Sequence, residues 1–133
     1  MQGKGGVDPE ADHGAWREHL LSRVADERVR KAVAFVFEHA TEDIALAGIA
    51  KAAGLSERNL SRLFAAESGF TPKQLQTRVR VETAKALLAK PRTSVTEAAF
   101  AVGYSSVSLF IEAFRNVTGK VPSLWRETGG VWR

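Results

Sequence analysis

The chain has 133 residues, a net charge of +4 and a composition that is 44% hydrophobic and 26% charged. This length suits one domain or two very small ones, and the sequence shows neither a bilayer-spanning apolar run nor a secretory leader. We therefore expect a soluble, cytoplasmic protein. Because cysteine is absent and the three histidines lie in the first third, we also expect no metal, no cofactor and no catalytic residues.

The charge is distributed unevenly along the chain. Residues 1–43 carry 6 basic and 9 acidic side chains, whereas residues 44–133 carry 13 basic and 6 acidic ones, a net charge of +7. A basic segment of this size suits a polyanionic partner, either nucleic acid or an anionic membrane surface. Solvated Lys and Arg on the surface of a helical protein would give the same count. An enzyme is disfavoured, because the basic segment has no His or Cys and its Glu residues are scattered.

The first 28 residues divide into two parts. Residues 1–14 are rich in Gly and charge and lack an apolar period, so we predict a disordered lead-in or a remnant added for expression. From Trp16, apolar residues recur at intervals of three and four, which predicts an N-terminal helix or interdomain linker over residues 15–28. Asp26 is a suitable start for the next helix. The rest of the chain is helical by pattern up to a short tail, residues 129–133, so the fold class is all-α.

A sequence pattern in the first half of the chain recurs in the second half. An Ala-x-x-x-Gly-apolar-Ser pattern begins at Ala50 and again at Ala99, and a Phe…Gly-x-x-Pro pattern begins at Phe64 and again at Phe114. The sequence separation between equivalent residues of the two copies grows from 49 to 50, so the second copy contains one inserted residue. Two copies are too few for a stacked-repeat architecture, which favours two similar modules joined by a connecting helix.

Each copy has the layout of a helix-turn-helix subdomain. Gly54 and Gly103 are predicted to end the first helix of each pair at a positive φ, and Ser56 and Ser105 are predicted to cap the second helix. These patterns define a first subdomain over residues 29–71 and a second over residues 91–128. Gly48 weakens the first helix of the first subdomain, which is therefore frayed or held by tertiary contacts.

One long helix is predicted between the two subdomains, over residues 72–90. Thr71 is its candidate N-cap, and Pro72 suits the first helical position. After Pro91, the residues Ser94 to Glu97 form a capping-box pattern that opens the second subdomain.

These residues resemble the DNA-binding domain of the AraC/XylS family of bacterial transcription regulators. The resemblance runs from about residue 29 to residue 126 and is most specific from Ser94 to Pro122. It implies about seven helices, with two helix-turn-helix subdomains bridged by a long helix and two recognition helices that enter successive major grooves on one face of the duplex. Such grooves recur about every 34 Å, so a single chain can read two half-sites.

Base reading is expected mainly from the first recognition helix, through the side chains of Glu57, Arg58, Ser61 and Arg62. Arginine can bind guanine O6 and N7 with two hydrogen bonds. The alternative is that Arg58 and Arg62 contact only phosphate, or pair with Glu57 or Glu67.

In the second recognition helix the candidate base-reading residues are Ser106, Val107, Ser108 and Glu112. This helix departs from the family pattern, which typically has an Arg where Glu112 stands. A carboxylate is repelled by phosphates, although it can accept a hydrogen bond from cytosine, and Val107 can pack on a thymine methyl. We therefore expect this subdomain to position the protein more than it reads sequence.

Phosphate contacts are expected from basic or polar residues, several of which stand near helix starts. The candidates are Lys51, Lys73, Gln74, Arg78, Arg115, Lys120, Ser123 and Arg126. Each of them could equally be a solvated side chain. Trp125 is predicted to anchor the last helix in the core, whereas the pattern does not decide between core and surface for Phe100.

The sequence thus predicts a transcription regulator, activator or repressor, that binds double-stranded DNA sequence-specifically. The alternatives are nonspecific DNA binding and a helical module that binds a protein or a membrane surface; basic residues at helix starts in two repeated modules favour DNA over a membrane. The resemblance implies a separate effector-binding domain, which these residues lack, so the chain is stand-alone or the C-terminal part of a longer protein. We expect a nucleoid-associated monomer. RNA polymerase is a further partner if the protein activates transcription, but no residue marks such a surface.

Overall fold

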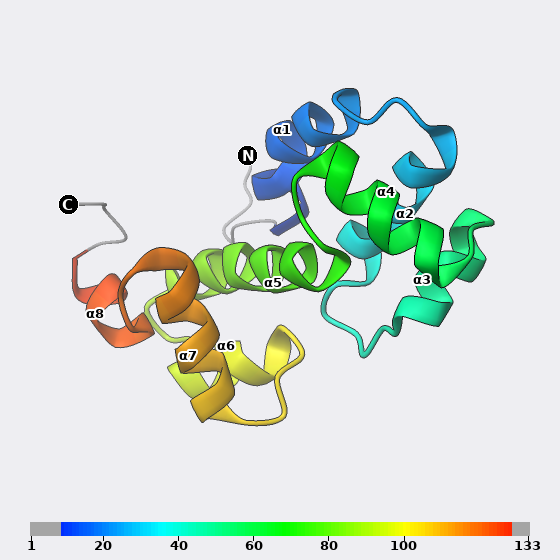
Figure 1. Cartoon of the computed structure of the whole chain (residues 1–133). Coiled ribbons are helices and arrows are strands. Elements are labelled where there is room, and N and C mark those ends of the chain that lie inside the picture. The colour runs from blue at the N-terminus through cyan, green and yellow to red at the C-terminus, as the bar shows by residue number, and fades with distance from the viewer. Residues whose placement is uncertain (1–8, 129–133) are drawn as a thin grey trace. The chain divides into compact units, whose positions relative to one another are not determined.

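A computed structural model describes the chain over residues 9–128, and the side chains over residues 13–128 (Figure 1). Over this range the chain forms eight α-helices and no strand, which confirms the predicted all-α class. The helix additional to the expected seven is α1. The helices are α1 (Pro9–Ser22), α2 (Glu27–His39), α3 (Leu46–Ala53), α4 (Glu57–Ser68), α5 (Pro72–Leu88), α6 (Val95–Ala101), α7 (Val107–Thr118) and α8 (Pro122–Glu127).

The described chain divides into two compact units, each with its own hydrophobic core. We call residues 14–79 the first module and residues 80–128, together with the described residues before Gly14, the second module. The helix α5 is continuous and passes from one module to the other. None of the described helices combines the length and the apolar character needed to cross a membrane.

The start of α1 corrects the predicted lead-in. Residues 9–14, which we expected to be disordered, form the first turns of this helix, and residues 1–8 lie outside the described residues. The helix is anchored further along, where Leu20 is buried and the Trp16 ring meets Phe37 edge-on at 5.0 Å between centroids. Before Trp16 the sequence has no apolar period, and the buried side chain there is His13, which a hydrophobic pattern does not detect.

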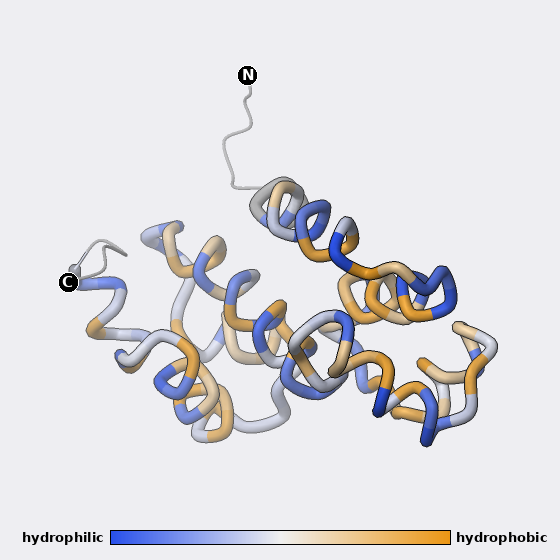
Figure 2. Tube along the Cα trace, turned by 45° about the horizontal axis from the view of Figure 1, so that its top comes forward, coloured by the Kyte–Doolittle hydropathy of each residue, from blue (hydrophilic) through white to orange (hydrophobic). Residues whose placement is uncertain are grey.

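The first module packs α2, α3, α4 and the start of α5 around one core. In α2 the buried residues Val29, Ala32, Val33 and Val36 follow the spacing of one helix face. In Figure 2 hydrophobic and hydrophilic residues alternate along the helices in the same way. The core residues contributed by the other helices are Ile49, Ala50, Ala53, Leu60, Phe64, Leu75 and Val79.

Side chains satisfy the first backbone N–H groups of α2 and α5. Asp26 accepts a hydrogen bond from Arg28 N, and the Arg28 guanidinium together with this N–H lowers the pKa of Asp26 to about 2. The cap is therefore an anion at neutral pH, the charge that a helix N-terminus favours. At α5, Thr71 Oγ1 accepts from Gln74 N at 3.0 Å and Gln74 Oε1 accepts from Thr71 N at 2.9 Å. Thr71 is thus the predicted N-cap, within a capping box.

The second module is built around a row of aromatic side chains. Phe110 and Phe114 are fully buried, with ring centroids 5.7 Å apart, and Trp125 meets Phe114 edge-on at 5.8 Å. Trp125 is therefore a core residue, as expected, whereas Phe100 is 53% exposed. The predicted capping box at the start of α6 is present, with hydrogen bonds in both directions between Ser94 and Glu97.

The turns of the two helix-turn-helix units differ by one residue. Gly54 and Gly103 have φ values of +73° and +104°, the left-handed conformations that were predicted. In the first module Ser56 follows two residues later and caps α4. In the second module the cap is Ser106, not the predicted Ser105, because the inserted residue lengthens the turn before α7.

Gly48 lies exposed within α3, and a Cβ added there would meet no atom within 4 Å. We expect Gly48→Ala to stabilise the protein by about 0.5–1 kcal/mol, because alanine loses less backbone entropy in a helix than glycine does. Gly54→Ala is the matched control: it should destabilise the protein, since φ is +73° at that position. Urea unfolding followed by circular dichroism checks both changes. A loss of stability in Gly48→Ala would contradict the account of α3.

Candidate nucleic-acid interface

The second helices of the two helix-turn-helix units, α4 and α7, are equivalent position by position. Their N-caps are Ser56 and Ser106, and both helices end at a glycine with positive φ, Gly69 and Gly119. The buried positions Leu60, Phe64 and Ser68 correspond to Phe110, Phe114 and Thr118. The offset is 50 throughout, so the face of α4 that is exposed can be compared directly with that of α7.

The hydroxyl groups near the ends of these helices repeat the equivalence. Ser68 Oγ donates to Phe64 O at 2.6 Å, and Thr118 Oγ1 donates to Phe114 O at 2.8 Å. Each hydroxyl also bonds the backbone of the residue two positions later, Phe70 or Lys120. Both helices are therefore held at their C-terminal ends in the same way.

The exposed face of α4 carries all four predicted base-reading residues. Glu57, Arg58, Ser61 and Arg62 are exposed, and Arg62 Nη2 donates to Asn59 Oδ1 at 3.3 Å. The alternative pairing with Glu67 is not what the structure shows, because Glu67 Oε1 accepts from Ala25 N and Asp26 N in the loop before α2. The two arginines of α4 thus keep their guanidinium groups on the protein surface.

The exposed face of α7 differs from the prediction. Ser108 and Glu112 are exposed, but Val107 is half-buried and packs against the core of the second module, and Ser106 Oγ accepts the capping hydrogen bond from Leu109 N. Leu109, which was not among the predicted base-reading residues, is 52% exposed. Aligning α7 with α4 from their capping serines, at a separation of 50 residues, would have identified Leu109, because this alignment makes Leu109 the equivalent of Asn59.

Most of the predicted phosphate-binding residues lie on the surface. Lys51, Lys73, Gln74, Arg115 and Ser123 are exposed, and Lys120 is half-exposed. Gln74 also closes the capping box of α5. The Arg78 side chain is exposed and its guanidinium carbon lies 5.8 Å from the centroid of the Trp16 ring. Surface position is necessary for a phosphate contact, and these residues meet that condition.

Arg126 is the exception among the predicted phosphate contacts. Its Nε donates to Leu88 O at 3.0 Å, and its Nη2 donates to Lys90 O at 3.1 Å and to Thr93 O. The guanidinium therefore joins α8 to the end of α5 and to the loop before α6. These hydrogen bonds engage Nε and Nη2 within the protein, and Arg126 is therefore left out of the interface proposed below.

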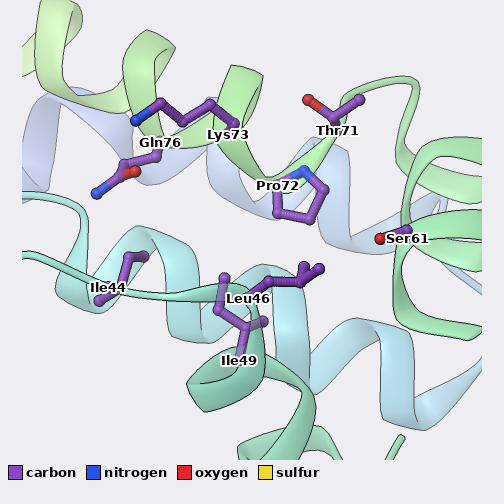
Figure 3. A pocket seen from close by; sticks show the side chains of 8 residues that line it. All are labelled: Ile44, Leu46, Ile49, Ser61, Thr71, Pro72, Lys73 and Gln76. Carbon is purple, nitrogen blue, oxygen red and sulfur yellow. The ribbon is translucent and has the colours of Figure 1, made fainter. Parts of the chain in front are cut away.

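Two predicted DNA contacts of the first module, Ser61 and Lys73, line one cleft. The cleft has a volume of about 330 Å³, and Figure 3 shows Ser61 coming from α4 and Lys73 from the start of α5. The other lining residues are Ile44, Leu46, Ile49, Thr71, Pro72 and Gln76. The first module therefore brings a base-reading candidate and a phosphate-binding candidate, 12 residues apart in sequence, to the same part of its surface. Among the described residues no group of three or more metal-binding side chains occurs.

The comparisons with known proteins agree with this geometry. A helix-turn-helix domain family model matches residues 49–128. Among curated relatives, an uncharacterized HTH-type transcriptional regulator of Haemophilus influenzae is 29% identical over 109 residues, which is 82% of this chain and 37% of that protein. The XylDLEGF operon transcriptional activator 2 of Pseudomonas putida is 31% identical over 96 residues, which is 70% of this chain and 61% of that protein. The chain thus spans less than two thirds of the length of either relative.

Solved structures give the same result. The C-terminal domain of AraT, a response regulator from Geobacillus stearothermophilus, has a TM-score of 0.74 and 31% identity, covering 80% of this chain and 88% of that one. The DNA-binding domain of AdpA, a global transcriptional factor solved in complex with a target DNA, has a TM-score of 0.71 and 29% identity, covering 77% and 93%. The fold and the duplicated recognition helix define a DNA-binding domain of a transcription regulator. The chain belongs to this helix-turn-helix family, and the resemblance to AraC/XylS regulators is confirmed.

Proposed function

We propose that this chain reads double-stranded DNA with α4 and α7 in successive major grooves, as the DNA-binding part of a bacterial transcription regulator. The observation that carries the proposal is the shared register of the two helices, which gives each an exposed N-terminal half. One chain then offers two recognition helices, as a helix-turn-helix dimer does, and can bind as a monomer. Its place of action is the cytoplasm, on chromosomal DNA.

The two modules contribute differently to DNA recognition in this proposal. Arg58 and Arg62 of α4 read base edges, and guanine is the base that a guanidinium binds best in the major groove. Lys51, Lys73, Gln74 and Arg78 of the first module, and Arg115, Lys120 and Ser123 of the second, hold the phosphates and fix the register. The +7 charge of residues 44–133 supports this assignment.

Removing one base-reading arginine tests the proposal. We expect Arg62→Ala to weaken binding to a selected duplex by about 5- to 150-fold, corresponding to the roughly 1–3 kcal/mol of one bidentate contact, and to relax preference at one base pair only. Arg23→Ala is the matched control. It removes the same charge in the segment before α2, where the backbone of Ala25 and Asp26 contacts Glu67 near the C-terminal end of α4.

Fluorescence anisotropy on specific and scrambled duplexes, at several salt concentrations, makes the measurement. An equal loss of affinity in Arg62→Ala for both duplexes would assign this residue to phosphate. No loss on either duplex, or the same loss in Arg23→Ala, would refute the proposed interface on α4.

A further inference from the structure

The exposed faces of α4 and α7 have opposite chemistry at equivalent positions. Where α4 presents Asn59 and Arg62, α7 presents Leu109 and Glu112, and all four residues are exposed. In α4 the two side chains are hydrogen-bonded to each other, which makes a polar, cationic surface. In α7 the pair offers one apolar group and one anion. The two helices therefore present different chemical groups at these equivalent positions.

Leu109 is unusual for its exposure. It is 52% exposed, and within the described part of the chain only Phe100 and Leu124 are other large hydrophobic residues that are exposed. Those two residues lie on α6 and α8, whereas Leu109 is the third residue of α7. The first turns of a recognition helix are the part that meets base edges in helix-turn-helix proteins.

The major groove has one apolar group that suits such a side chain, the 5-methyl group of thymine. The neighbouring Glu112 carboxylate is repelled by phosphates and accepts from the amino group of cytosine, so it also favours a base edge over the backbone. Arg115 is exposed one turn further along and can hold a phosphate. Ser108 and Glu112, which flank Leu109 on α7, are polar and exposed, and a single exposed leucine between them is matched by one methyl group.

We infer that Leu109 reads a thymine by packing on its 5-methyl group, and that this residue, rather than the half-buried Val107, gives the second module its sequence preference. The inference rests on the proposed function, because it requires α7 to enter the groove. It changes the expected role of this module from mainly positioning the protein to recognition of one thymine beside a polar base edge.

Replacing thymine by deoxyuridine removes only the methyl group and tests the inference. In a duplex selected with the full chain, we expect one deoxyuridine in the half-site of the second module to weaken binding about fourfold, the equivalent of roughly 0.8 kcal/mol for one buried carbon. In Leu109→Ala the same base change should have no effect, so the two changes form a double-mutant cycle. Leu109→Met should keep part of the preference for thymine.

Leu124→Ala is the matched control, because Leu124 is 46% exposed on α8 and loses the same apolar group. It should retain the fourfold preference for thymine. An equal loss from deoxyuridine in the parent chain and in Leu109→Ala would overturn the inference, and so would insensitivity of the parent chain to every thymine. Unchanged DNA binding in Leu109→Ala would also overturn it and would point to a protein partner. Failure of the parent chain to select any duplex would instead contradict the proposed function.

Discussion

Phe114→Ala is expected to reduce the free energy of unfolding by about 3–5 kcal/mol, the cost of deleting a fully buried aromatic ring. Phe114 has no exposed surface and lies between Phe110 and Trp125 in the core of the second module. Its removal leaves a cavity that three short helices, α6, α7 and α8, are poorly able to fill. A loss of this size is a large fraction of the roughly 5–15 kcal/mol that stabilises a typical protein.

Urea unfolding followed by circular dichroism measures this loss, and amide NMR spectra show where the structure loosens. Phe64→Ala is the matched change, because Phe64 occupies the equivalent buried position of α4. It should produce a loss of similar size whose largest spectral changes fall in residues 14–79, whereas those of Phe114→Ala should fall in residues 80–128. Leu124→Ala, an exposed position, should change stability by less than about 0.5 kcal/mol. If Phe114→Ala behaved like Leu124→Ala, the core described for the second module would be wrong.

Arg126→Ala is expected to destabilise the protein by about 2–4 kcal/mol. The Arg126 guanidinium donates to the carbonyl oxygens of Leu88, Lys90 and Thr93, and its removal takes this donor from all three, although Lys90 O still accepts from Thr93 N at 3.2 Å. Hydrogen bonds to a charged group contribute roughly 1.5–3 kcal/mol, and an acceptor left unsatisfied costs a similar amount when water cannot reach it.

Arg126→Lys separates this role from a contact with phosphate. Lysine keeps the charge but lacks the planar fork, so it should recover little of the stability, whereas a phosphate contact would survive the change. The measurements are the urea midpoint and the salt dependence of DNA binding. Full stability in Arg126→Ala, accompanied by a salt slope lower by about one, would show that the sequence-based assignment to phosphate was right.

The sequence predicts the repeated architecture well because local chemistry decides it. The order of residues directly indicates glycines at positive φ, serine and threonine caps, and apolar residues at helical spacing. Gly54, Thr71 and Ser94 behave as predicted. The sequence-based predictions are wrong where a tertiary contact determines the local structure. The start of α1 has no apolar pattern to reveal it, and the register of α7 depends on how the inserted residue is accommodated in the turn.

Long polar side chains are the second source of error. Sequence patterns assign Arg and Lys to the surface, but the chain can use a guanidinium inside the fold. Arg126 binds three carbonyl groups, and Arg80 is buried with its guanidinium carbon 4.9 Å from the centroid of the Tyr104 ring. The exposed Leu109 was missed for the converse reason, because apolar residues are assigned to the core by default.

Selection of bound duplexes from a randomised DNA library, with the parent chain and with Arg62→Ala, tests whether each recognition helix reads its own groove. We expect two enriched blocks whose centres are about 10 base pairs apart, one containing guanine and the other thymine. Arg62→Ala should relax the guanine block and leave the thymine block unchanged. A single enriched block, or relaxation of both blocks together, would contradict the assignment of one recognition helix to each groove.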